Sequence, residues 1–148
     1  MKKKLIFICL FLIIPIKTFA LIEVDITRGN LNPLPLAVSP LSIDENSKKS
    51  FEKILDKENI GSEISIIVEN NLRTSGLFNP LSKDAFLQAP DIANLKPRFE
   101  DWNLIKAQAL ITGKVTYVDE KLRVEFRLWD VLAGKEMMAL AFTTVPNN

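Results

Sequence analysis

The strongest pattern in the chain lies between Gly61 and Leu81, where large apolar residues recur at helical spacing. A helix over Ser62 to Ser75 is predicted, because these side chains fall three or four residues apart on one stripe. The stripe consists of Ile60, Ile64, Ile67, Val68 and Leu72. We expect Ser62 to cap the first turn, Gly76 to end the helix in a left-handed conformation, and Pro80 to prevent it from resuming.

Alternating apolar and polar residues predict strands on both sides of this helix. Leu21 to Thr27 alternates cleanly, and Leu34 to Leu41 is a short apolar strand with prolines near its ends. A return strand near Leu77 to Ser82 would complete a strand–helix–strand crossover. Residues 42–59 are polar and lysine-rich, and predict one helical turn held loosely against the body. Its apolar positions are Phe51, Ile54 and Leu55.

The second half of the chain predicts a helix followed by three strands. The helix runs from Phe99 to Gln108, with Trp102 as a core or capping residue. The strands cover residues 110–118, 122–128 and 138–145, with Gly113 at a point of close packing. We therefore predict an α/β fold: a mixed β-sheet of about five strands, with two main helices packed on one face. The three-strand meander should be polar on one side and covered by helices on the other.

The amino-terminal residues favour an exported protein. Met1 to Ala20 carries lysines, a 12-residue apolar run from Leu5 to Ile16, and Thr18-Phe19-Ala20, a pattern typical of a secretory signal cleaved after Ala20. An uncleaved amino-terminal anchor is the alternative. Cleavage would remove the chain's one cysteine, Cys9, and four of its lysines, changing the formal net charge from +1 to −3. Neither composition nor charge suggests binding to nucleic acid or an anionic surface.

Few residues in the chain are suited to catalysis or metal binding. There is no histidine, the mature chain would have no cysteine, and the five glycines stand alone rather than in a phosphate-binding loop. The acidic pairs Asp44-Glu45, Glu100-Asp101 and Asp119-Glu120 fit turns and helix starts. We predict no catalytic residue, no metal site and no cofactor, so that a binding protein is favoured over a carboxylate-dependent hydrolase.

Several stretches together resemble the amino-terminal domain of the TolB family, the periplasmic component of the Tol-Pal system. The run Asn71-Leu72-Arg73-Thr74-Ser75-Gly76-Leu77-Phe78-Asn79-Pro80-Leu81 is the most specific. The other matching stretches are residues 22–29, 35–40, 107–115 and 127–131, together with Trp102. The resemblance covers essentially the whole of residues 21–148.

The resemblance implies a non-enzymatic periplasmic protein that supports outer-membrane invagination at cell division and envelope integrity. Members carry a small α/β domain followed by a six-bladed propeller that binds the lipoprotein Pal. Their first mature residues bind the inner-membrane protein TolA by strand addition, in a conformation that depends on Pal. Carried onto this sequence, the partner-binding arm is Leu21, Ile22, Glu23, Val24, Asp25, Ile26, Thr27 and Arg28.

The sequence departs from the family pattern after the α/β domain. No blade-length repeat follows, so we expect the propeller and its Pal site to be absent and the chain to be a truncated or split reading frame. Two alternatives stay open at this point. The arm could be an ordinary edge strand, and the chain could be an outer-membrane accessory or envelope-assembly module of another family.

Overall fold

The computed structural model describes residues 32–55, 59–91 and 96–145, and the structural statements below concern those segments. The elements are β1 (Leu34–Val38), β2 (Ser42–Ile43), α2 (Glu45–Leu55), α3 (Ile60–Thr74), β3 (Phe78–Pro80), η1 (Lys83–Ala85), α5 (Phe99–Leu104), β4 (Ala109–Val118), β5 (Lys121–Asp130) and β6 (Lys135–Thr144).

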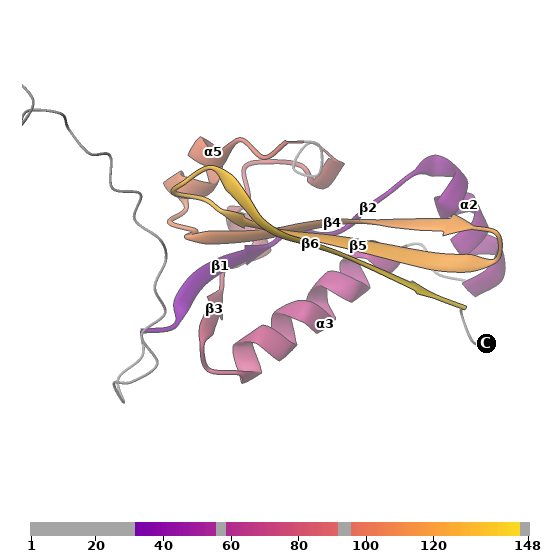
Figure 1. The fold of residues 1–148 in the computed structure, drawn as a ribbon, viewed down its shortest axis with the longest axis horizontal. Helices are drawn as coiled ribbons and strands as arrows, with labels where there is room; N and C mark the ends of the chain where they lie inside the picture. Colours follow the sequence, from indigo (N-terminus) through magenta and orange to yellow (C-terminus); the bar gives the residue numbers. More distant parts are fainter. Residues whose placement is uncertain (1–31, 56–58, 92–95, 146–148) are drawn as a thin grey trace, which may run out of the picture. The chain divides into compact units, whose positions relative to one another are not determined.

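The strands form one mixed sheet in the order β3-β1-β4-β5-β6, with the short β2 also pairing with β4 (Figure 1). β1 is parallel to both β3 and β4, with Leu36 opposite Pro80 on one side and Ala109 on the other. β4, β5 and β6 follow one another as antiparallel neighbours. The crossover from β1 through α3 to β3, the carboxy-terminal meander and the α/β class are therefore confirmed.

The helices lie on both faces of the sheet. Leu36 and Val38 of β1 face α3, whereas Ala37 between them belongs to a cluster with Trp102 of α5. Figure 1 accordingly shows α3 and α5 on opposite sides of the sheet. The α/β class, the mixed sheet and its two main helices are confirmed. The two helices expected on one face were those over residues 62–75 and 99–108, and this placement was wrong, because α3 and α5 lie on opposite faces. The helix that shares a face with α3 is α2.

The loose helical turn expected in residues 42–59 is in fact the packed helix α2. Phe51 is 1% exposed and contacts the ring of Tyr117 on β4 edge to face, with centroids 5.8 Å apart. Ser47 also accepts a 2.8 Å hydrogen bond from the backbone N–H of Tyr117. The prediction of loose attachment was wrong because the lysines suggested a solvated segment, while one aromatic and one serine hold the helix to the sheet.

Helix α3 begins earlier than predicted and has a narrower apolar stripe. It starts at Ile60 after Asn59, so Ser62 lies inside the first turn and makes no side-chain cap. Ile67 is 59% exposed, which contradicts its placement in the stripe. Ile60 is buried, and the other stripe members, Ile64, Val68 and Leu72, pack against the core. Gly76 has the predicted left-handed backbone, with φ of 73°.

Helix α5 is shorter than the predicted segment 99–108. It ends at Leu104, and Lys106 adopts a φ of 61°, which a continuing helix does not allow. Trp102 is 1% exposed, so its predicted place in the core is confirmed.

Close packing at Gly113 is also confirmed. A Cβ atom built there would meet the carbonyl oxygen of Glu125 at 2.3 Å and the side chain of Leu41 at 3.0 Å. The predicted reversal after β4 occurs at Asp119 and Glu120, both with positive φ, as a tight hairpin turn requires.

Candidate partner-binding surface

The predicted partner-binding residues, Leu21 to Arg28, and the predicted cleavage site at Ala20 lie outside the described residues. The description begins at Asn32, directly before β1, whose Leu34 N–H donates a 2.9 Å hydrogen bond to the carbonyl of Leu77. β1 is an interior strand between β3 and β4. The arm is therefore joined by a short linker to a strand whose two edges are already paired.

The two edges of the sheet differ in how well they are protected. β3 has three residues, and Pro80 at its end lacks a backbone donor. β6 has ten residues, every one of them exposed, and no proline. A short strand with proline resists further pairing, whereas a long exposed strand presents a row of unpaired backbone groups. Among the described residues, β6 is thus the sheet edge best suited to accept another strand.

One face of β6 is apolar, and we refer to Met138, Leu140 and Phe142 as the β6 apolar face. They pair with Leu128, Phe126 and Val124 of β5, which pack partly against the core below α2 and α3. The β6 residues themselves are 52%, 49% and 57% exposed. The prediction that helices cover this side of the whole meander was therefore wrong for β6. Of the three meander strands, only β4 and β5 have side chains that pack against the described helices.

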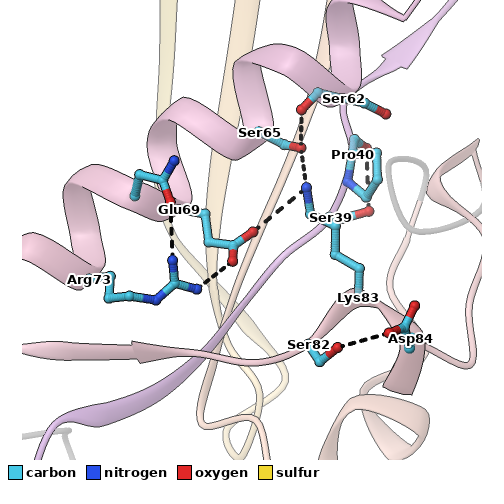
Figure 2. A network of polar contacts seen from close by, with 10 residues as sticks. Ser39, Pro40, Ser62, Ser65, Glu69, Arg73, Ser82, Lys83 and Asp84 are labelled. Carbon is cyan, nitrogen blue, oxygen red and sulfur yellow. Dashed lines mark hydrogen bonds and ion pairs between the residues drawn. The ribbon is translucent and has the colours of Figure 1, made fainter.

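A polar network joins α3 to the segment that follows β3 (Figure 2). The Lys83 ammonium donates a 2.9 Å hydrogen bond to the buried Ser65 hydroxyl and lies 3.6 Å from a Glu69 carboxylate oxygen. The other oxygen of Glu69 accepts a 2.6 Å bond from Arg73, while Ser65 donates to the carbonyl of Ser62. Lys83 was not singled out from the sequence, because it lies in an irregular segment without periodicity. Through Ser65 and Glu69, Lys83 joins the segment after β3 to α3.

Gln88 performs a similar task on the opposite face of the sheet. Its buried side-chain carbonyl accepts hydrogen bonds from the indole N–H of Trp102 at 2.8 Å and from the backbone N–H of Arg98 at 3.2 Å. Phe86 contacts the same indole ring edge to face, with centroids 5.0 Å apart. The segment after η1 is thereby fixed over α5 by one glutamine and one aromatic side chain.

A cleft of about 420 Å³ lies beside β2, and charged residues of both signs are among those that line it. Its lining residues are Ser42, Ile43, Asp44, Asp91, Gly113, Lys114, Glu125 and Arg127. Asp44 caps α2, because its carboxylate accepts bonds from the backbone N–H and the hydroxyl of Ser47 at 3.0 and 2.9 Å. The Ser47 backbone bond is the main reason that the pKa of Asp44 lies below its usual value, and Lys114 also lowers it. The acidic pair Asp44-Glu45 thus has the helix-start role predicted for it.

Within the described segments, no group of three or more acidic, histidine or cysteine side chains is arranged to hold a metal ion. None of the helices in that part of the chain is long and apolar enough to cross a membrane.

Comparison with known proteins decides the family. The model of the TolB amino-terminal domain matches residues 22–137. The chain belongs to the TolB amino-terminal domain family. It is 85% identical over 139 residues to the Tol-Pal system protein TolB of Pelagibacter ubique (strain HTCC1062). That match covers 94% of this chain and 31% of the relative, so the chain spans about a third of the curated relative's length.

Solved structures share the fold at low sequence identity. TolB from Acinetobacter baumannii superposes with a TM-score of 0.53 at 20% identity, covering 77% of this chain and 23% of that one. The carboxy-terminal domain of LpoB from Escherichia coli gives a TM-score of 0.55 at 13% identity, covering 80% of this chain and 87% of the domain. These likenesses show the fold alone. Proteins of the TolB family are non-enzymatic components of the Tol-Pal system, which agrees with the prediction made for this chain.

Proposed function

We propose that this chain is a periplasmic component of a Tol-Pal system and that its arm, Leu21 to Arg28, binds a TolA-like inner-membrane protein by strand addition. The observation that carries the proposal is the 85% identity to a Tol-Pal system protein TolB over nearly the whole chain. Such a component would support outer-membrane invagination at division and envelope integrity. The TolB family is periplasmic, and this location agrees with the secretory signal predicted at residues 1–20.

The composition of the arm supports strand addition. Ile22, Val24 and Ile26 alternate with Glu23 and Asp25, so an added strand would present one apolar and one acidic face. In this mode the backbone supplies most hydrogen bonds, while alternate side chains fill pockets on the partner. The arm precedes β1 in the chain, and β1 keeps both of its neighbours in the described sheet when the arm binds a partner.

Calorimetric titration of the chain with the purified carboxy-terminal domain of a TolA-like protein tests the proposal. Deletion of residues 21–27 should abolish the binding heat and leave far-UV circular dichroism nearly unchanged, because every described helix and strand is kept. Val24→Ser should weaken binding by about tenfold or more, since it empties an apolar pocket worth about 1.5–3 kcal/mol. Glu23→Gln on the other face is the matched control and should bind almost as the parent does. Unchanged affinity after the deletion would show that the arm is not the contact.

A further inference from the structure

We propose that the described sheet transmits tension, and that force applied to the chain before β1 and after β6 is resisted along the length of the strands. β1 is parallel to β4, and β4, β5 and β6 alternate in direction, so β1 and β6 run the same way. The chain therefore enters the sheet at the start of β1 and leaves it at the end of β6, at opposite ends of the sheet (Figure 1).

The direction of the force decides how many hydrogen bonds oppose it at one time. The bonds of a β-ladder join two strands side by side, so strands that are pulled lengthwise in opposite directions strain all of these bonds together. Strands that are pulled apart sideways lose the same bonds one after another. Tension between the start of β1 and the end of β6 loads the sheet in the first way, because both points lie on the strand axes.

β1 is hydrogen-bonded on both of its edges near the point where the force would enter. The Leu34 N–H donates a 2.9 Å hydrogen bond to the carbonyl of Leu77 on the β3 side. On the β4 side, the Gln108 N–H donates a bond of the same length to the carbonyl of Pro35. β1 can therefore leave the sheet lengthwise only if the bonds on both of its edges break.

The side chains of β1 prevent it from relieving the force by slipping along its neighbours. Leu36 and Val38 pack on the α3 face, Ala37 packs in the cluster of Trp102 on the other face, and these three β1 residues are no more than 1% exposed. A slip of one residue sends every side chain of a strand to the opposite face. Val38 would then have to fit the place of Ala37 beside the buried Trp102 ring.

The two ends of the path through the sheet are also held firmly. Behind β1, Leu41 is buried and its N–H donates a 3.3 Å hydrogen bond to the carbonyl of Gly61 in α3. A Cβ atom at Gly61 would overlap the Leu41 carbonyl, so the two backbones are in direct contact. At the other end, β6 pairs with β5 as far as Thr144, which lies opposite Leu122.

The biological use of this resistance rests on the proposed function. A component that binds an inner-membrane protein through its arm and supports invagination of the outer membrane lies between two membranes, and tension on the arm reaches the domain at the start of β1. A pulling experiment on the chain alone needs no partner. Its failure is therefore distinct from a failure of the arm to bind in the calorimetric titration.

Single-molecule pulling of the full chain in an optical trap, through handles attached to introduced cysteine pairs, tests the proposal. Cys9, the chain's one cysteine, is replaced by serine in every variant. Asn32→Cys with Val145→Cys places the handles at opposite ends of the sheet, on exposed residues. Asn32→Cys with Ala133→Cys is the matched control, because Ala133 is exposed in the turn between β5 and β6, at the end of the sheet where β1 starts.

The first pair should unfold at a severalfold higher mean force than the control pair at the same loading rate, because forced unfolding follows the rate of crossing the barrier in the pulled direction. Equal forces, or a higher force for the control pair, would overturn the proposal. Urea unfolding verifies that the two variants are equally stable, so that any difference in force comes from its direction. If Ala133→Cys lowers the urea midpoint, Leu132→Cys, which is 66% exposed in the same turn, takes its place.

Discussion

Replacement of Phe51 by alanine tests how firmly α2 is held to the sheet. Phe51 is 1% exposed and belongs to a buried cluster with Leu41, Ile60 and Val115. Truncation of a phenylalanine in a core costs about 3–5 kcal/mol, of which the edge-to-face contact with Tyr117 supplies about 0.5–1.5 kcal/mol. Since domains are stable by about 5–15 kcal/mol, the variant should lose a large share of its free energy of unfolding.

Urea unfolding followed by far-UV circular dichroism measures this loss. With a slope of about 1–3 kcal/mol per molar urea, Phe51→Ala should shift the midpoint by roughly 1–5 M. If Phe51→Ala does not fold, Phe51→Leu gives a milder version, expected to cost about 1–2 kcal/mol because it keeps most of the buried aliphatic volume. Lys49→Ala is the control on the exposed side of α2 and should stay within about 0.5 kcal/mol of the parent.

A Phe51→Ala variant whose free energy of unfolding lies within about 1 kcal/mol of the control would show that Phe51 does not hold α2 to the sheet. Helix α2 would then be the loosely attached segment that the lysine-rich sequence suggested. A double-mutant cycle with Tyr117→Leu would separate the ring contact from the rest, with an expected coupling of about 0.5–1.5 kcal/mol.

Three other substitutions test the packing and the polar contacts. Gly113→Ala should destabilise the domain by about 2 kcal/mol or more in urea unfolding, because the new methyl group meets a β5 carbonyl oxygen at 2.3 Å; an unchanged midpoint would contradict this. Trp102→Phe should cost about 1–3 kcal/mol in the same assay, since it leaves the buried Gln88 carbonyl without its indole donor; equality with the parent would show that this bond contributes nothing. The lowered pKa of Asp44 means that its stabilising effect is present above its unfolded value of about 3.8 and is lost as pH falls through its folded pKa. Asp44→Asn keeps a good helix cap for the Ser47 N–H and should flatten the loss of thermal stability below about pH 4; a parallel acid limb in both proteins would argue against the assignment.

The sequence features that predicted the structure best were the alternation of apolar and polar residues in strands and the positions of individual glycines. The alternating run from Leu122 to Leu128 lies inside β5, and Gly76 and Gly113 occupy the backbone positions expected of them. Ile67 was misplaced because helical spacing defines the centre of an apolar stripe but not its margins. One side of α3, including Ile67, is exposed to solvent, and the sequence of the helix alone does not indicate which side that is.

Contacts between distant parts of the chain could not be predicted. Ser47 and Tyr117, 70 residues apart, share a hydrogen bond that fixes α2, and neither residue belongs to a local pattern that indicates it. Lys83 and Gln88 likewise act through partners that only the fold brings near. The two candidate binding segments differ in how they were found. The arm at residues 21–28 was proposed from alternation and family resemblance and remains a prediction, whereas the open edge at β6 became visible only once the sheet order was known.

The position of β1 within the sheet has a consequence for the order in which the domain forms. β1 has no partner of its own until residues 78–80 and 109–111 have been synthesised, because both of its neighbours come later in the chain. β4, β5 and β6 need only local hairpins, which close far faster than pairings across long loops. The first strand of the described sheet therefore stays unpaired until most of the domain has been made, and the centre of the sheet is completed only when residues 109–111 can pair with β1.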